Sequence, residues 1–266
     1  MGNKLKFKGK DAVSFNALRK FKTKVFRKIK NKYKRFRWRL LPEKSGSRIV
    51  FILGCQRSGK TLLMRLLDND KRILVYHSVS TITDVRLKSK EIVGSETSKY
   101  CSPITAIKLP AENQNAATLL DTYPKSLAIW VFRDFRDTVF YNLATFCTQV
   151  GTLKKIFYDD SDWRAEKVSK QTLDLVRNFF SDSMSKENAS ALFWYCRNTL
   201  FFEQRLQHDS RVLLISYESL VKDTYSTLNR IFSFMDLAYP CENIIQDVKD
   251  LTGVGHSLKI SHSIIS

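Results

Sequence analysis

The segment from residue 54 to residue 61 constrains the fold of this chain more than any other. It reads GCQRSGKT, which fits the pattern of two glycines five residues apart followed by Lys and then Ser or Thr. An apolar run rich in β-branched residues precedes it at 48–53, and leucines at helical spacing follow it. Strand, glycine loop and helix in this order predict a cradle for a phosphate-like anion. Glycine lets backbone N–H groups approach the anion, and the helix N-terminus adds partial positive charge.

Further apolar runs predict the rest of the fold. Helical stretches separate them, and they lie at 104–109, 127–132 and 211–215. This alternation predicts an α/β protein, a P-loop three-layer fold whose central parallel sheet is flanked by helices. We expect one such domain over residues 45–266, with a helical cap at about 151–208 that encloses the second substrate.

The positive charge of the chain is concentrated at one end. The net charge is +19, but residues 1–48 hold 18 Lys and Arg against only Asp11 and Glu43, a net of +16, and the remainder carries only +3. A body this close to neutrality argues against nucleic acid as a partner. We therefore treat residues 1–44 as a separate basic arm.

The basic arm has the pattern of an amphipathic helix. Its large apolar residues recur in steps of three or four at positions 15, 18, 21, 25, 29, 33, 36 and 40, with Lys and Arg on the other face. Phe26, Tyr33, Phe36 and Trp38 lie in this stripe or beside it. Such a helix, over residues 14–41, is suited to an anionic membrane surface. Two alternatives stay open: the arm packs its stripe on the domain, or it recruits a polyanionic substrate or nucleic acid.

Cysteine usage and hydropathy indicate the cellular compartment in which the protein is expected and argue against a structural metal site. The five cysteines are about 45 residues apart, with no CxxC and no Cys/His pair at ligand spacing, so neither a zinc site nor a disulfide framework is expected. No secretory segment stands near the N-terminus and no apolar run approaches bilayer length. We expect a cytoplasmic protein with reduced thiols, associated peripherally with a membrane if the arm binds lipid.

The loop alone does not decide which anion it binds. A P-loop kinase or NTPase also needs a carboxylate for Mg²⁺, normally an Asp at the end of a second buried strand. The candidate is Asp134, but Arg133 stands between this carboxylate and the apolar run at 127–132. A cation in this place favours a second anion site over a metal site. A Mg²⁺-dependent kinase or NTPase stays open as the alternative.

Four motifs in register resemble the sulfotransferases that use 3′-phosphoadenosine 5′-phosphosulfate. RSGKTL at 57–62 looks like the family's 5′-phosphosulfate loop, and RDFRDTV at 133–139 looks like its 3′-phosphate strand and helix. FWYCRN at 193–198 and SYESLVKD at 216–223, followed by LNRIFSF at 228–234, resemble the C-terminal half of bacterial members. The resemblance implies transfer of a sulfuryl group to a hydroxyl or amine, with no metal required.

The resemblance also implies the residues of the site. Those expected to bind the donor are Gly54, Gln56, Arg57, Ser58, Gly59, Lys60, Thr61, Leu62, Arg133 and Tyr141. Arg57 and Lys60 are the cations that would reach the bridging and leaving oxygens of the phosphosulfate. The chain departs from the family at two positions. Lys60 stands where Thr or Ser is usual, and Tyr141 stands where the 3′-phosphate site has Ser. A phenol still donates a hydrogen bond, and Asn142 is an alternative donor.

The acceptor hydroxyl needs a general base, which is usually Glu or His in this family. His77 follows a short apolar run after the first helix, and an imidazole has a pKa suited to neutral pH. Asp84 and Glu96 are the next candidates. Tyr217 and Glu218 either shape the acceptor pocket or support the loop. We expect the acceptor to be a hydroxyl-bearing small molecule, lipid or glycan.

Overall fold

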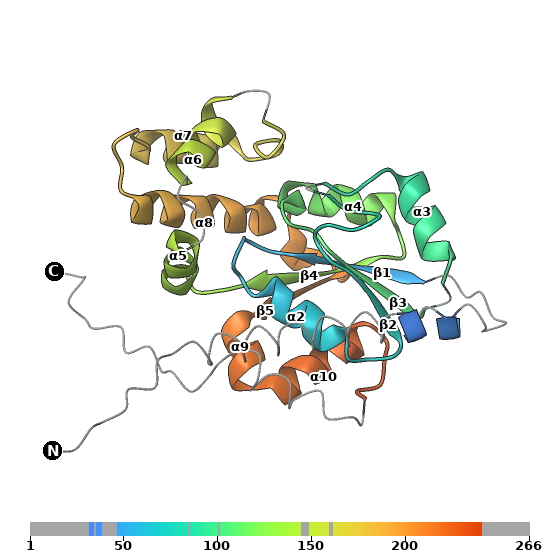
Figure 1. Ribbon diagram of the computed structural model, residues 1–266. Helices are drawn as coiled ribbons and strands as arrows, with labels where there is room; N and C mark the ends of the chain where they lie inside the picture. The colour runs from blue at the N-terminus through green and yellow to red at the C-terminus, as the bar shows by residue number, and fades with distance from the viewer. Residues whose placement is uncertain are drawn as a thin grey trace, which may run out of the picture.

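Figure 1 shows the computed structural model of the chain, which describes residues 32–34, 36–38, 47–84, 86–100, 102–144, 149–159 and 162–240. The strands are β1 (Arg48–Leu53), β2 (Ile73–Tyr76), β3 (Ile104–Lys108), β4 (Leu127–Phe132) and β5 (Val212–Ser216). They form one sheet with the order β2-β3-β1-β4-β5, and every neighbouring pair is parallel. The predicted parallel sheet is confirmed, with β1 at its centre.

Helices cover both faces of the sheet, as the predicted three-layer fold requires (Figure 1). One face carries α2 (Lys60–Leu67), α9 (Tyr217–Lys222) and α10 (Thr224–Phe234). The other carries α3 (Lys90–Ser98), the 3₁₀ turn η1 (Glu112–Asn115), α4 (Ala116–Thr122) and the C-terminal end of α8 (Lys186–Glu203). The remaining elements are α5 (Phe135–Leu143), α6 (Gln149–Tyr158), α7 (Lys170–Phe179) and the 3₁₀ turn η2 (Leu206–His208). Helices α5, α6 and α7 all pack on α8. The described residues of the region predicted as a cap, 151–208, are therefore mainly helical.

Alternate residues of β1 face the two helical layers. Val50 and Ile52 join the cluster on the α2 and α10 side, whereas Phe51 and Leu53 join the cluster on the α4 and α8 side. All residues from Ile49 to the end of the strand are buried. A strand covered on both faces has no solvent-facing side, which explains the uninterrupted apolar run that precedes the loop.

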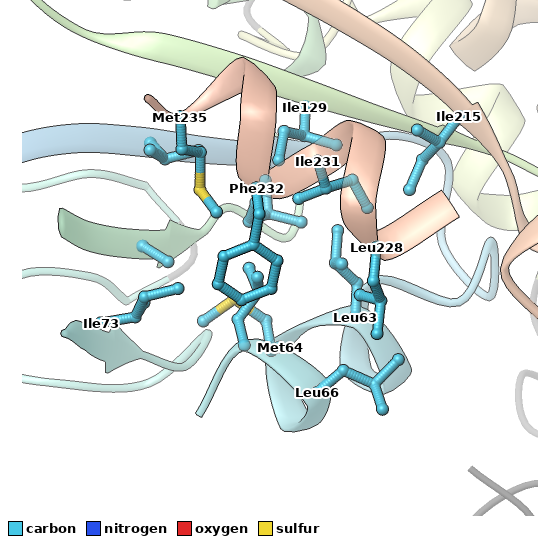
Figure 2. Packing of buried hydrophobic residues seen from close by; sticks show 14 of the residues in the cluster. Leu63, Met64, Leu66, Ile73, Ile129, Ile215, Leu228, Ile231, Phe232 and Met235 are labelled. Atoms are coloured by element: carbon cyan, nitrogen blue, oxygen red, sulfur yellow. The ribbon is translucent and has the colours of Figure 1, made fainter. Parts of the chain in front are cut away.

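The helix that follows the loop is fixed by a continuous core. Figure 2 shows Leu63 and Met64 of α2 in one cluster with Leu228 and Phe232 of α10 and with Ile129 of β4. Each of these side chains is fully buried. Burial of one such side chain contributes about 1.5–3 kcal/mol to the free energy of unfolding. The N-terminus of α2, where the loop ends, is therefore held in a fixed position relative to the sheet.

The strand boundaries follow the prediction, with one strand added. β1 and β4 have the predicted limits, whereas β3 ends one residue earlier and β5 is shifted by one residue. β2 was not predicted as a strand, because four residues leave no periodicity to read. It pairs with β3, Ile73 lying opposite Ile104, and so forms the edge of the sheet next to His77.

A short part of the basic arm lies within the described residues, and it is helical at 32–34 and 36–38. Lys34 and Trp38 are buried on the domain: Lys34 Nζ donates to the main-chain oxygens of Asp68 and Ile73, and Trp38 joins the core cluster on the α4 side. Tyr33 and Phe36, which belong to the predicted stripe, are 66% and 62% exposed. At these positions the residues that pack on the domain are therefore those outside the stripe.

The rest of the arm, including Phe26 and residues 14–31 and 39–41, lies outside the described residues. The domain boundary at residue 44 stays a prediction. Among the described helices, none combines the length and the apolar character needed to cross a membrane.

Candidate functional site

The loop after β1 has the backbone geometry of an anion cradle. Gly54 has φ +126° and Gly59 has φ +98°, conformations that favour glycine. A Cβ on Gly54 would lie 2.2 Å from the main-chain oxygen of Val131, and a Cβ on Gly59 would lie 2.3 Å from the ring of Tyr217. Gly59 is also the N-cap of α2. The predicted order of strand, glycine loop and helix is confirmed.

Polar groups fix the loop from within and leave one hydroxyl unused. The buried Lys60 Nζ donates to the main-chain oxygen of Gly54, closing the loop on itself. The N–H of Gly54 donates to Asn113 Oδ1 at 3.2 Å. Ser58 Oγ is buried and has no hydrogen-bond partner in the described part of the chain. A buried hydroxyl without a partner costs free energy, so this position suits an incoming oxygen acceptor.

Positive charge is concentrated around the loop. Lys108, at the end of β3, donates from Nζ to Thr61 Oγ1 at 2.7 Å. Burial lowers the pKa of Lys60 from 10.5 to about 7, and the charges of Lys108 and Arg197 act in the same direction. The pKa of Lys108 is also lowered, first by burial and then by the charge of Arg57. A bound anion would relieve both the desolvation and the repulsion of these cations.

Arg133 follows β4 and reaches back to the loop. Its Nη1 donates to the main-chain oxygen of Arg57 at 3.3 Å, and its Nη2 donates to Asp137 Oδ2 at 3.3 Å. The residue is only 8% exposed, yet Nε has no hydrogen-bond partner among the described residues. A buried guanidinium with a donor left over is suited to an anion. Arg133 and the loop therefore form two adjacent candidate subsites for an anion.

Two aromatic rings cover Arg133. The guanidinium carbon lies 4.0 Å from the ring centroid of Tyr217 and 4.6 Å from that of Tyr141. Tyr217 also fills the space next to Gly59, so one ring contacts both subsites. Glu218 Oε1 accepts a hydrogen bond from the N–H of Asp134 at 3.0 Å. Of the two sequence interpretations of Tyr217 and Glu218, these contacts favour support of the loop and of Arg133.

Asp134, the candidate metal carboxylate of the kinase alternative, serves as a helix cap. Its Oδ1 accepts from the N–H of Arg136 at 2.9 Å, and both oxygens bond the Arg136 side chain. The hydrogen bonds from Arg136 lower the pKa of Asp134. Its carboxylate is engaged at the N-terminus of α5, where negative charge is favourable. Within the described residues, no group of three or more His, Cys, Asp or Glu side chains could hold a metal ion.

Comparison with known families gives the family of the chain. The sequence profile of the sulfotransferase family matches residues 72–240, which is more than half of the chain. The chain belongs to the sulfotransferase family. It is therefore an enzyme of the sulfuryl-transfer class, and the predicted family and reaction class are confirmed. A search of curated protein sequences found no match.

Solved structures with a similar fold are also sulfotransferases. The sulfotransferase domain from the curacin biosynthetic pathway has a TM-score of 0.51 and 16% identity, over 76% of this chain and 77% of that one. A mouse sulfotransferase complexed with PAP has a TM-score of 0.45 and 14% identity, over 78% and 66%. A sulfotransferase from Mycobacterium avium has a TM-score of 0.45 and 14% identity, over 79% and 69%. The first of these confirms the predicted fold.

The candidate bases of this sulfotransferase lie on the β2 side of the sheet. His77 directly follows β2, which β3 separates from β1, so it lies about 10 Å from the β1 axis at ordinary strand spacing. Its main-chain oxygen accepts from Thr83 Oγ1 at 2.8 Å, which fixes the turn after β2. The carboxylate of Glu96 pairs with Lys99 and accepts from Thr81 Oγ1. Asp84 is exposed. Of these three candidates, His77 is the one that directly follows a strand, at the edge of the sheet where the glycine loop also follows β1.

Helix α8, which belongs to the region predicted as a cap, packs directly on the loop. Cys55 lies in one buried cluster with Ala189, Phe193 and Cys196 of α8. Burial raises the pKa of Cys55 to about 11, so the thiol stays protonated and acts as a small apolar residue. The loop is therefore held from the cap side as well as from the sheet.

Sequence reasoning missed Lys108 and Asn113. Lys108 pairs in register with Ile52, next to the start of the loop. A polar residue near the carboxyl end of the predicted strand 104–109 was the signal that could have found it. Asn113 bridges the loop to the cap, because its Nδ2 donates to the main-chain oxygen of Arg197 at 3.4 Å. No sequence pattern marks such a long-range contact.

The two predicted 3′-phosphate donors next to each other on α5 have different surroundings. Tyr141 is 42% exposed and contacts Arg133 through its ring. Asn142 is fully buried, and neither of its side-chain polar atoms has a hydrogen-bond partner in the described residues. The structure thus brings Tyr141, rather than Asn142, into contact with Arg133.

Proposed function

We propose that this sulfotransferase moves a sulfuryl group from 3′-phosphoadenosine 5′-phosphosulfate to a hydroxyl or amine of its acceptor, and that no metal ion takes part. One observation carries the proposal: Arg133 lies next to the loop, bonded to the main-chain oxygen of Arg57. A donor with a phosphosulfate at one end and a 3′-phosphate needs two anion subsites. A nucleoside triphosphate needs one, together with a metal carboxylate.

The side chains with unused donors match these two groups. Ser58 Oγ and the backbone of the loop would hold the 5′-phosphosulfate, together with Lys60 and Thr61. Arg133 Nε would hold the 3′-phosphate. Gly54, Gln56, Arg57, Gly59 and Leu62 complete the proposed donor site. The donor supplies the SO₃ group that is transferred.

The cations around the loop would stabilise the charge that develops on the phosphate as the sulfuryl group leaves. Lys60 and Arg57 are the proposed catalytic cations, and the position of Lys108 on Thr61 adds a third. Fixed cations in a site partly closed to water stabilise such charge more than solvated cations do. By analogy with phosphoryl transfer, this positioning would supply most of the rate acceleration.

His77 is the proposed general base, which accepts the proton of the acceptor hydroxyl. It lies at the carboxyl edge of the sheet, where ligands of parallel sheets bind. The His77→Gln variant should lower kcat by about 10²–10⁴ and leave bisphosphate binding unchanged, because general acid–base catalysis is worth that factor. Asp84→Asn is a control expected to keep near-normal turnover. If His77→Gln also keeps near-normal turnover, another group accepts the proton.

The acceptor would bind between the loop and the helical cap. The cluster around Cys55 and Phe193 joins these two parts, so an acceptor held by the cap would lie beside the donor. We propose that residues 45–266 form the catalytic domain, with the cap at about 151–208, and that the acceptor is a hydroxyl-bearing small molecule, lipid or glycan.

Ligand binding tests the proposed donor against the kinase alternative. Adenosine 3′,5′-bisphosphate should raise the free energy of unfolding by about 2.7 kcal/mol at 100 times its dissociation constant, with or without Mg²⁺. Mg-ATP at the same concentration should give a smaller shift, because it lacks the 3′-phosphate. Thermal unfolding in the presence of each ligand measures the difference. Stabilisation by Mg-ATP alone would contradict the proposal.

We further propose that the basic arm over residues 14–41 binds an anionic membrane surface. The exposure of Tyr33 and Phe36, while Lys34 and Trp38 pack on the domain, supports this partner. The arm's excess of Lys and Arg adds electrostatic attraction of about 1 kcal/mol per residue near the surface. The alternative of a polyanionic substrate or nucleic acid stays open.

Vesicle binding tests the proposed membrane contact. Sedimentation with vesicles that contain phosphatidylserine should retain the protein, and neutral vesicles should not. The double change Tyr33→Ser and Phe36→Ser should weaken retention, whereas Phe179→Ser, an exposed aromatic on α7, should not. Equal retention on neutral vesicles, or equal loss in both variants, would contradict this role.

A further inference from the structure

The guanidinium group of Arg133 lies over two aromatic rings. Its two hydrogen bonds, to Arg57 and Asp137, are both 3.3 Å long, at the weak end of the range for N–H···O bonds. The rings of Tyr217 and Tyr141 lie much closer to ideal contact, at 4.0 and 4.6 Å from the guanidinium carbon. Nε, in contrast to Nη1 and Nη2, has no hydrogen-bond partner among the described residues.

The two rings come from different elements. Tyr141 lies two turns into α5 and Tyr217 is the first residue of α9. Arg133 itself is fixed at the end of β4, where its main-chain oxygen accepts from Trp194 Nε1 at 2.9 Å. The base of the side chain is therefore set by the backbone, and its far end is set by the two rings.

We propose that Tyr141 is a positioning residue: its ring, together with that of Tyr217, fixes the plane of the Arg133 guanidinium so that Nε is presented to the 3′-phosphate of the donor. This proposal rests on the proposed function. It replaces the role that the family resemblance implied for this position, a hydroxyl that donates to the phosphate. A ring acts through its π face, so the hydroxyl of Tyr141 is not required.

The physical gain from such a contact is preorganisation. An arginine side chain has many rotamers, and an unrestrained guanidinium would be drawn to the partly exposed carboxylate of Asp137. With its plane fixed by the rings, Arg133 keeps an in-plane edge directed at the anion. A bidentate arrangement with phosphate depends on that plane.

Three substitutions of Tyr141 separate the contribution of its ring from that of its hydroxyl. Tyr141→Phe keeps the ring, Tyr141→Leu removes it at similar bulk, and Tyr141→Ser places a small hydroxyl there as in the family pattern. The affinities for adenosine 3′,5′-bisphosphate and adenosine 5′-monophosphate are measured by titration calorimetry, and their ratio reports the 3′-phosphate contact alone. Phe179→Leu is the matched control, because Phe179 is an exposed aromatic residue on α7, away from Arg133.

The expected result is a preserved ratio in Tyr141→Phe and in the control. Tyr141→Leu and Tyr141→Ser should each lower the ratio by about threefold to thirtyfold, through weaker bisphosphate binding and unchanged monophosphate binding. Equal losses in Tyr141→Phe and Tyr141→Leu, or no loss in Tyr141→Leu, would overturn the positioning role. If the unmodified protein shows no preference for the bisphosphate, the proposed 3′-phosphate subsite itself is wrong. Thermal unfolding of each variant shows that it is folded, which is expected because Tyr141 is partly exposed.

Discussion

The two proposed anion subsites of this sulfotransferase are built in different ways. The loop subsite comes from one continuous segment, with Gly54 and Gly59 in backbone conformations that favour glycine and Lys60 closing the loop on its own backbone. The Arg133 subsite is assembled from the end of β4, a ring on α5 and a ring on α9. The first depends on backbone geometry and the second on side-chain packing.

This difference sets how each subsite should respond to substitution and to pH. A subsite formed by backbone groups should lose its function when a new side chain clashes with it or when its central cation is removed. A subsite formed by a side chain against aromatic rings should lose anion affinity in smaller steps, because each ring contributes only part of the binding free energy. Five measurements test this contrast.

The largest effect is expected from Lys60→Ala. This change removes the buried cation that bonds the main-chain oxygen of Gly54 and lies at the proposed phosphosulfate site. Loss of one such preorganised group should lower kcat by about 10²–10³, measured with labelled donor under saturating conditions. Lys71→Ala, an exposed lysine outside the site, should keep near-normal turnover. Comparable activity of the two variants would remove Lys60 from catalysis.

The next effect is on stability, in Gly54→Ala. A Cβ there would lie 2.2 Å from a main-chain oxygen, in a backbone conformation that alanine rarely adopts. We expect the free energy of unfolding to fall by about 3 kcal/mol. The control Gly94→Ala, in α3 with no atom within 4 Å of the new Cβ, should raise stability by up to about 1 kcal/mol. Urea unfolding measures both, and a free energy of unfolding that is unchanged or raised in Gly54→Ala would show that the loop tolerates a side chain at position 54.

A smaller effect is expected from Arg133→Lys. The charge is kept, but the planar group that stacks on the two rings is lost. Bisphosphate affinity should fall about tenfold, with monophosphate affinity nearly unchanged, because Lys keeps the charge and so loses only part of the roughly 1.5–3 kcal/mol that a charge-assisted hydrogen bond contributes. Calorimetric titration checks this. A parallel loss for both ligands would mean that Arg133 acts on the loop rather than on the 3′-phosphate.

The smallest expected effect is the dependence of bisphosphate affinity on pH. Burial lowers the pKa of Lys60 to about 7, so above that pH the free protein holds Lys60 neutral, and anion binding must take up a proton. Bisphosphate affinity should therefore fall about fivefold between pH 7 and about pH 8. Calorimetry in buffers of different ionisation enthalpy measures the proton uptake, which should disappear in Lys60→Met.

The same pKa shift gives the sign of a stability effect. Between about pH 7 and the ordinary lysine value of 10.5, the unfolded chain binds more protons at this position than the folded chain does. The contribution of Lys60 to the free energy of unfolding should rise with pH in this window. The difference between the unmodified protein and Lys60→Met in urea unfolding isolates it, and a falling contribution would mean that Lys60 is not buried as a free amine.

The loop, the central strands and the family could be predicted from residue patterns alone. The pattern of residues 54–61 and the apolar run before it depend on local geometry and on burial of both strand faces, which leave a local record in the sequence. Arg133 could be predicted for the same reason, because it directly follows a strand whose end must lie beside the end of β1.

The surroundings of these residues became visible only in the folded structure. Tyr217 lies 84 positions after Arg133 in the sequence and contacts it, and Asn113 joins the loop to α8. Lys34 packs on the domain, whereas Tyr33 and Phe36 of the predicted stripe are exposed. Such contacts depend on which helix faces which strand. They leave no periodic trace, because a single side chain at the right place is enough to make each of them.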